Sequence, residues 1–97
     1  MHHAMMLEEF SQKVLKTRVS RGEGKMRDKA QIMDDLKQVF GDGELVNILR
    51  DQTNAHMAMT DGQVKSVVIM IHGFLVSNGQ PRDRDLLPIS TYMNTCR

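Results

Sequence analysis

The hydrophobic and polar positions of this chain follow the period of an α-helix over most of its length. Apolar residues recur three or four positions apart, which places them on one face of a helix and leaves polar residues on the other. The pattern predicts helices over about 4–19, 26–40 and 44–59, the last weakened after residue 52. Polar breaks that contain glycine, at 20–24 and 41–43, separate these segments.

A longer apolar run occupies residues 61–77, and its ends carry helix signals. Thr60 and Gln63 have the spacing of a capping box, and Gly79 stands where a glycine often ends a helix. Many of the residues between are β-branched, which is typical of a strand, but the length of the run favours a helix. The apolar positions with helical spacing are Val64, Val67, Val68, Ile71 and Leu75.

Part of this run, VVIMIHGFLVSNG at 67–79, resembles the start of an α/β-hydrolase. In that family an apolar strand leads into a His-Gly loop that helps to form the oxyanion hole. The family also needs a G-x-S-x-G turn, followed by an acid and a histidine. The sequence has no G-x-S-x-G, and the residues after Gly79 are too few for the rest of such a sheet. We therefore expect His72 to lie at a helix contact rather than to act in catalysis.

These segments predict an all-α fold, a small bundle of four main helices with a short fifth helix near the C-terminus. The helical domain is expected to span 1–80, with 81–97 as a tail or short docking helix. The chain has 97 residues, nine of them Met and only 4% aromatic, so its core is small and soft. A second subunit would add buried area, and we expect a homodimer that associates through Val64, Val67, Val68, Ile71 and Leu75.

Charge is unevenly distributed, although the formal net charge is only +1. Residues 13–29 carry seven Lys and Arg against two Asp and Glu, whereas residues 30–51 have a net charge of −3. A basic stretch can neutralise nucleic-acid phosphates, although most charge runs are simply solvated surface. The side chains expected to bind nucleic acid are Lys13, Lys16, Arg18, Arg21, Lys25 and Arg27.

The sequence offers little that would support catalysis or metal binding. It has no C-x-x-C, no H-x-x-x-H and no phosphate-binding glycine motif, so we expect no enzyme, metal, cofactor or small-molecule substrate. Cys96 is the single cysteine, which favours a reducing compartment, and we expect it to be an exposed bystander thiol. There is no signal peptide and no run long enough to cross a membrane, so we expect a cytoplasmic protein.

Two functions remain open. The first is a small regulatory protein that binds nucleic acid, or a protein bound to nucleic acid, through residues 13–29. The alternative is a protein-protein adaptor, inhibitor or chaperone that uses a Met-rich apolar surface, because methionine adapts to varied partners. That surface would need Met57, Met59 and Met70 to be exposed.

Overall fold

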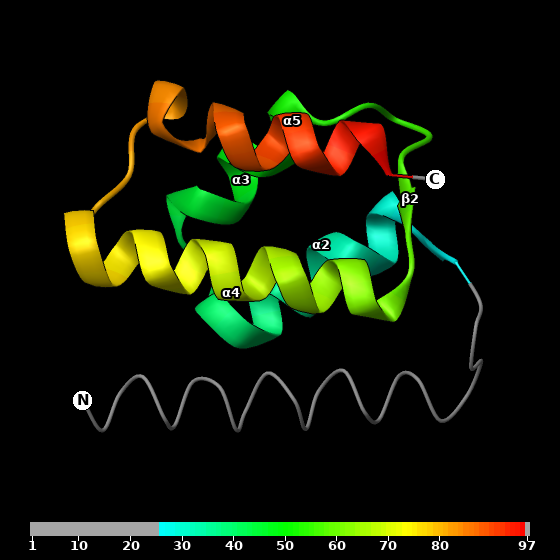
Figure 1. Ribbon diagram of the computed structural model, residues 1–97, viewed down its shortest axis with the longest axis horizontal. Helices are drawn as coiled ribbons and strands as arrows, with labels where there is room; N and C mark the ends of the chain where they lie inside the picture. The colour runs from blue at the N-terminus through cyan, green and yellow to red at the C-terminus, as the bar shows by residue number, and fades with distance from the viewer. Residues whose placement is uncertain (1–25, 97) are drawn as a thin grey trace.

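The computed structural model describes residues 26–96, and this part of the chain is mostly helical (Figure 1). The all-α class predicted from the hydrophobic pattern is therefore confirmed. The helix predicted over 4–19 lies outside the described residues. In chain order the elements are β1 (Arg27–Asp28), α2 (Lys29–Phe40), α3 (Glu44–Gln52), β2 (Ala58–Met59), α4 (Asp61–Asn78), the 3₁₀-helix η1 (Asp83–Leu86) and α5 (Leu87–Thr95).

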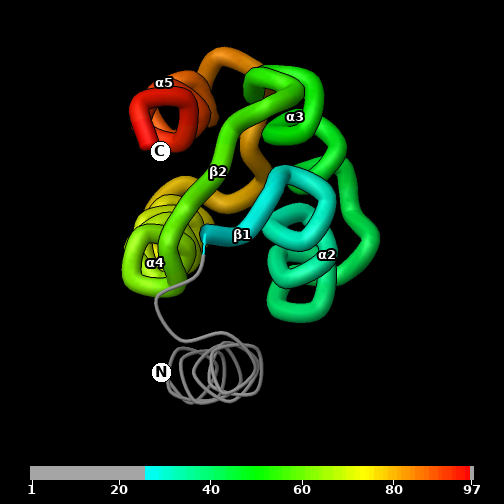
Figure 2. The backbone as a smooth tube through the Cα atoms, turned by 90° about the vertical axis from the view of Figure 1, so that its right-hand side faces the viewer, coloured from blue at the N-terminus to red at the C-terminus, as the bar shows by residue number. Residues whose placement is uncertain are grey.

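The helices form two layers, with α4 and α5 in one and α2 and α3 in the other (Figure 2). At one end the strands β1 and β2 pair antiparallel, with Arg27 opposite Met59 and Asp28 opposite Ala58. This short ladder joins the start of α2 to the start of α4, and the pattern of the sequence did not predict it. The fully enclosed apolar side chains between the layers are Ile32, Leu36, Leu49, Met59, Val64, Val67, Ile71, Leu86 and Met93.

Helix α2 begins at Lys29, later than the predicted start at residue 26, because Asp28 caps it. The Asp28 carboxylate accepts a hydrogen bond of 2.9 Å from the backbone N–H of Gln31, which satisfies one of the donors left free at a helix start. The helix ends at Gly41, as predicted, where φ is +86°. Glycine adopts this left-handed backbone without the steric cost that other residues incur.

Helix α3 ends at Gln52, so the predicted extension towards residue 59 is wrong. Thr53 follows with an extended backbone, and its hydroxyl donates to the Leu49 carbonyl at 2.8 Å. The Lys29 ammonium group donates to the carbonyls of Arg50 and Thr53, each at 2.7 Å. These bonds satisfy carbonyls at the end of α3 and allow the chain to turn into β2.

Helix α4 confirms the helix predicted over 61–77 and excludes the strand. Thr60 and Gln63 form the predicted capping box: the Thr60 N–H donates to Gln63 Oε1 at 2.9 Å, and the Gln63 N–H donates to Thr60 Oγ1 at 3.2 Å. Gly79 ends the helix with φ of +77°. His72 lies within this helix, half-buried, and not in a loop after a strand.

The chain after Pro81 contributes to the same core as the other helices. Leu86, Ile89 and Met93 of η1 and α5 are buried in one hydrophobic cluster with residues of α2, α3 and α4. Cys96 belongs to this cluster and is only 4% exposed, so the prediction of an exposed thiol is wrong. Its Sγ donates to the Tyr92 carbonyl one turn earlier, at 3.4 Å.

Candidate functional site

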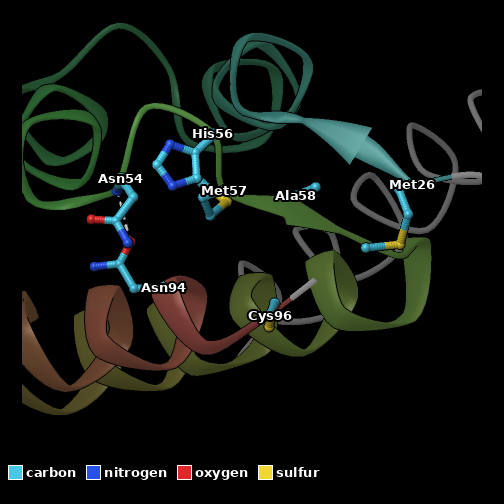
Figure 3. Close-up of a pocket in the computed structure, with 7 residues that line it drawn as sticks. All are labelled: Met26, Asn54, His56, Met57, Ala58, Asn94 and Cys96. Carbon is cyan, nitrogen blue, oxygen red and sulfur yellow. Dashed lines mark hydrogen bonds between the residues drawn. The ribbon is translucent and has the colours of Figure 1, made fainter.

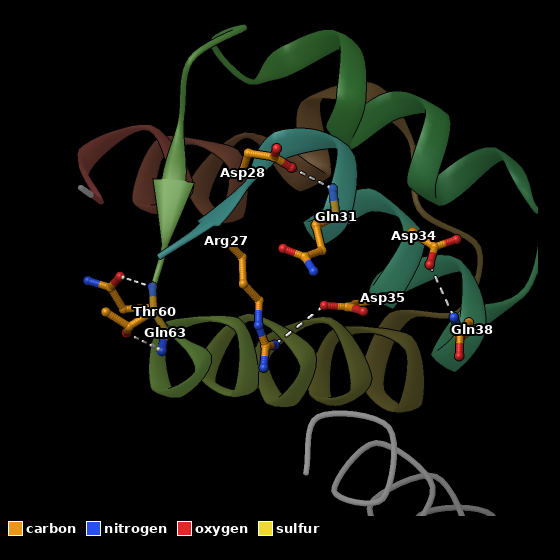
Figure 4. A network of polar contacts seen from close by, with 8 residues as sticks. All are labelled: Arg27, Asp28, Gln31, Asp34, Asp35, Gln38, Thr60 and Gln63. Atoms are coloured by element: carbon orange, nitrogen blue, oxygen red, sulfur yellow. Dashed lines mark hydrogen bonds and ion pairs between the residues drawn. The ribbon is translucent and has the colours of Figure 1, made fainter. Parts of the chain in front are cut away.

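The predicted nucleic-acid-binding set falls largely before the part of the chain that the structure describes. Arg27, which does lie within that part, is buried at 5% exposure. Its Nη1 lies 3.4 Å from Oδ2 of Asp35, as Figure 4 shows beside α4. Arg27 is therefore held inside the fold and is not displayed to a phosphate. The members outside the described residues are Lys13, Lys16, Arg18, Arg21 and Lys25.

Asp35, on α2, is a charged residue buried in the fold. It is 0% exposed, whereas its neighbour Asp34 is exposed. Asp35 follows Ile32 by three positions and precedes Val39 by four, so helical spacing places it on the apolar face. That spacing was the signal available in the sequence. The strand β1 completes the site because its pairing with β2 brings Arg27 against α2.

The side chains predicted to mediate self-association lie inside a single chain. The exposure of Val64, Val67, Val68 and Ile71 does not exceed 3%, and Leu75 is half-buried against the same core. Helix α4 packs against α2 and α5 in this region. Their burial is therefore provided within one chain and does not require a second copy.

Two of the three methionines expected at the surface are buried, so the predicted Met-rich surface is wrong in this respect. Met57 is 4% exposed and Met59 is fully enclosed, because the β1–β2 ladder directs this segment across the core. Met70, on α4, is 36% exposed.

An exposed apolar surface does occur on the outward face of α4. Ile69 is 56% exposed and Val76 is 70% exposed. The exposed positions recur at helical spacing, and the sequence has no Asp, Glu, Lys or Arg from residue 66 to residue 81. Helices at a protein surface ordinarily carry charged residues on the solvent side. We call this surface the α4 outer face; its residues are Ile69, Met70, Gly73, Val76 and Ser77.

A small pocket of about 210 Å³ lies between the end of α3, β2 and the C-terminal end of α5 (Figure 3). The Asn54 N–H donates to Oδ1 of Asn94 at 2.7 Å, and Nδ2 of Asn94 donates to the Gln52 carbonyl at 3.0 Å. Asn94 thus fastens α5 to the end of α3. The volume is below the range of about 300–1,000 Å³ typical of small-molecule sites. The pocket is lined by Met26, Asn54, His56, Met57, Ala58, Asn94 and Cys96.

Metal-binding side chains do not gather in residues 26–96: no group of three or more His, Cys, Asp or Glu is placed to hold an ion. Within the same residues, no helix combines the length and the apolar character needed to cross a membrane.

The chain matches no protein-family model, no curated protein and no solved structure.

Proposed function

We propose that this chain is a small non-enzymatic regulatory protein that binds nucleic acid, or a protein bound to nucleic acid, through the basic stretch 13–29. The observation that supports this function is the segregation of charge. Residues 26–96 carry seven Lys and Arg against nine Asp and Glu, a net charge of −2. Residues 13–25 carry five Lys and Arg against Glu23 alone, a net charge of +4. A polyanion is attracted to this short segment and repelled by the rest of the chain.

The phosphate contacts come from the basic residues before Met26. Arg27 no longer belongs to this set, because its guanidinium group is enclosed with Asp35. The ammonium group of Lys29 is also engaged within the fold, because it donates hydrogen bonds to carbonyls at the end of α3. Binding of this kind depends mainly on phosphate charge and little on base sequence.

A salt titration of duplex DNA binding tests the proposal. The slope of log K against log salt should be roughly −0.9 for each phosphate contact. The triple variant Arg18→Ala, Arg21→Ala, Lys25→Ala should bind more weakly with a shallower slope. The matched control, Lys37→Ala, Arg50→Ala, Arg84→Ala, removes the same charge from exposed positions of the folded part and should keep the wild-type slope. Equal losses in the two variants, or no binding to duplex DNA or RNA at about 50 mM salt, would contradict this function.

The alternative function is an adaptor, inhibitor or chaperone that contacts another protein. With Met57 and Met59 buried, its contact surface would be the α4 outer face. The basic triple variant and a further variant, Ile69→Glu, distinguish the two functions. The adaptor would keep its protein partner in the basic triple variant and lose it in Ile69→Glu.

We also propose the more detailed features that the sequence predicts. These are four main helices when the helix predicted over 4–19 is counted, a short fifth helix at the C-terminus, a homodimer and a cytoplasmic location. A homodimer would have to use side chains other than Val64, Val67, Val68 and Ile71, because one chain already encloses them. Light scattering on the full chain measures the mass directly, and a monomer at high micromolar concentration would contradict a stable dimer.

A further inference from the structure

Asn78 is the last residue of α4, and Gly79 follows it. The chain has four asparagines, at 47, 54, 78 and 94, and only Asn78 precedes a glycine. A backbone nitrogen attacks the preceding asparagine side chain most readily when it belongs to glycine, because glycine has no Cβ to shield it or to restrict the backbone. We propose that Asn78 is a site of spontaneous deamidation, which converts it to aspartate and isoaspartate and adds a negative charge at the end of α4.

The reaction uses two neighbouring groups of the chain and water. The backbone N–H of Gly79 gives its proton to a base in the solvent, and the nitrogen bonds to Cγ of Asn78. The bond between Cγ and Nδ2 breaks, and Nδ2 takes a proton from water and leaves as ammonia. Water then opens the resulting five-membered succinimide ring. Cleavage at Cγ gives aspartate, and cleavage at the main-chain carbonyl gives isoaspartate, in which the backbone runs through Cγ.

The surroundings of Asn78 and Gly79 are open to the base and the water that the reaction needs. All residues from Val76 to Gln80 are exposed. A Cβ added to Gly79 would meet nothing within 4 Å. Solvent therefore reaches both the attacking nitrogen and the amide that it attacks.

Two hydrogen bonds hold Asn78 and Gly79 in the helical arrangement. The Gly79 N–H donates to the Leu75 carbonyl at 3.0 Å, and this bond must break before the nitrogen can reach Cγ. Nδ2 of Asn78 donates to the Phe74 carbonyl at 3.3 Å, which is longer than the usual range of about 2.7–3.2 Å. Both bonds belong to the last turn of a helix, and exposed helix ends open at little cost in free energy. The reaction therefore requires this turn to open but does not require the core to unfold.

The other asparagines provide comparisons within the same chain. Oδ1 of Asn94 accepts a hydrogen bond from the Asn54 N–H at 2.7 Å, and its Nδ2 donates to the Gln52 carbonyl at 3.0 Å. Asn47 lies within α3 and precedes the β-branched Ile48, which is 7% exposed. Asn54 precedes an alanine. We therefore expect all three to react more slowly than the asparagine at the end of α4.

Both products should weaken the last turn of α4. A helix carries a partial negative charge at its C-terminal end, and the last turn of α4 has no basic residue to offset a carboxylate. The new charge would lie in a stretch, 66–81, that otherwise has no Asp, Glu, Lys or Arg. Isoaspartate also lengthens the backbone before Gly79, which displaces its N–H from the Leu75 carbonyl. These effects do not depend on what the basic stretch binds.

Tryptic peptide mapping of the full chain tests the inference, because each asparagine falls in a peptide of its own. Cleavage after Lys and Arg gives the peptides 38–50, 51–65, 66–82 and 85–97. During incubation in mildly alkaline buffer, 66–82 should be the first to gain the mass that converts an amide to an acid. It should also divide into two new chromatographic peaks, one for aspartate and one for isoaspartate. The control Asn78→Gln should leave 66–82 unmodified, because its longer side chain would need a larger ring.

The synthetic peptide 76–82 shows whether the folded chain protects this site. Asn78 in the full chain should react within about tenfold of the rate in the peptide, since exposed helix ends open at free energies near zero. A folded chain that reacts more slowly than this would overturn the inference. Conversion of Asn47 or Asn94 at the same rate as Asn78 would also overturn it.

Thermal unfolding measures the effect of the new charge. Asn78→Asp should have a Tm a few degrees below that of Asn78→Gln, because only the aspartate opposes the helix dipole. Added salt should reduce the difference, since both residues at this position are exposed to solvent. Equal Tm values for the two variants at low salt would overturn the inferred effect on α4.

Discussion

Arg27 and Asp35 meet inside the fold, with Nη1 of the arginine 3.4 Å from Oδ2 of the aspartate and their side chains 6% and 0% exposed. The contact ties β1 to α2 beside α4 (Figure 4). Buried charges are costly unless each is matched by an opposite charge and by hydrogen bonds. This relationship explains why an arginine from the basic stretch serves the fold rather than a ligand.

Removing one member of this pair should destabilise the protein strongly. Arg27→Met leaves the Asp35 charge enclosed without its arginine, which costs about 3–5 kcal/mol of unfolding free energy. Adding Asp35→Leu should recover much of that loss, because both charges of the buried pair are then replaced by apolar side chains. The control Arg50→Met breaks an exposed pair with Asp51 and should cost less than about 1 kcal/mol. Urea unfolding measures all three, and equal losses for Arg27→Met and Arg50→Met would contradict the prediction.

Two adjacent residues of α4 should respond in opposite ways to the same substitution. Val68 is 3% exposed and Ile69 is 56% exposed. Val68→Asp buries an unpaired charge in the core and should unfold the chain. Ile69→Asp places its carboxylate in water and should keep the helical signal in circular dichroism. If both variants retained the wild-type spectrum, Val68 could not lie in the core.

Deletion of one hydroxyl should show how much the capping box at the start of α4 contributes to the stability of the protein. Thr60→Ala removes the bond that Gln63 N–H makes to Thr60 Oγ1, at a cost of about 1 kcal/mol. For a domain of this size, that corresponds to a fall in Tm of about 4–8 °C. Thr91→Ala removes a hydroxyl from an exposed position within α5 and should change Tm little. A fall of the same size in both variants would show that the cap is not the cause.

The helices of this fold could be predicted from the sequence because their signals are local. The Thr60–Gln63 spacing and the stops at Gly41 and Gly79 involve residues only a few positions apart, and each was found in the structure. The end of α3 was missed because it depends on Lys29, which lies 21 positions before its partner Arg50. Contacts at such separations leave no periodic pattern in a sequence.

The candidate site was predicted less well for a related reason. Periodicity shows that one side of α4 is apolar, but it does not show what covers that side. Val64 and Ile71 were assigned to a second subunit, whereas α2 and α5 of the same chain enclose them. Met57 and Met59 became buried through the β1–β2 ladder, whose two-residue strands are too short to produce a pattern of alternation.

Tyr92 provides a measure of how tightly α5 is packed, because it is the single tyrosine and the chain has no tryptophan. Burial raises the pKa of Tyr92 above its ordinary value of 10.0, and the neighbouring Cys96 raises it further through charge and a hydrogen bond, while a hydrogen bond with Ser66 lowers it. The folded state therefore holds the phenolic proton more firmly than the unfolded chain. The corresponding stability is fully present below pH 10.0 and is lost as the pH rises through the folded pKa.

Titration of the ultraviolet absorbance of tyrosinate should show this shift, and two substitutions should move it in opposite directions. Cys96→Ala removes a neighbouring group that raises the pKa of Tyr92, so this pKa should fall towards its ordinary value. Ser66→Ala removes the hydrogen bond that lowers it, so the pKa should rise further. Above pH 10.0 the unfolding midpoint should fall with pH until Tyr92 ionises in the folded state, so the fall should be largest in Ser66→Ala and smallest in Cys96→Ala. If Tyr92 titrated at the same pH in the wild type and in both variants, its environment would not include Cys96 and Ser66, and the packing of α5 against α4 at this point would be wrong.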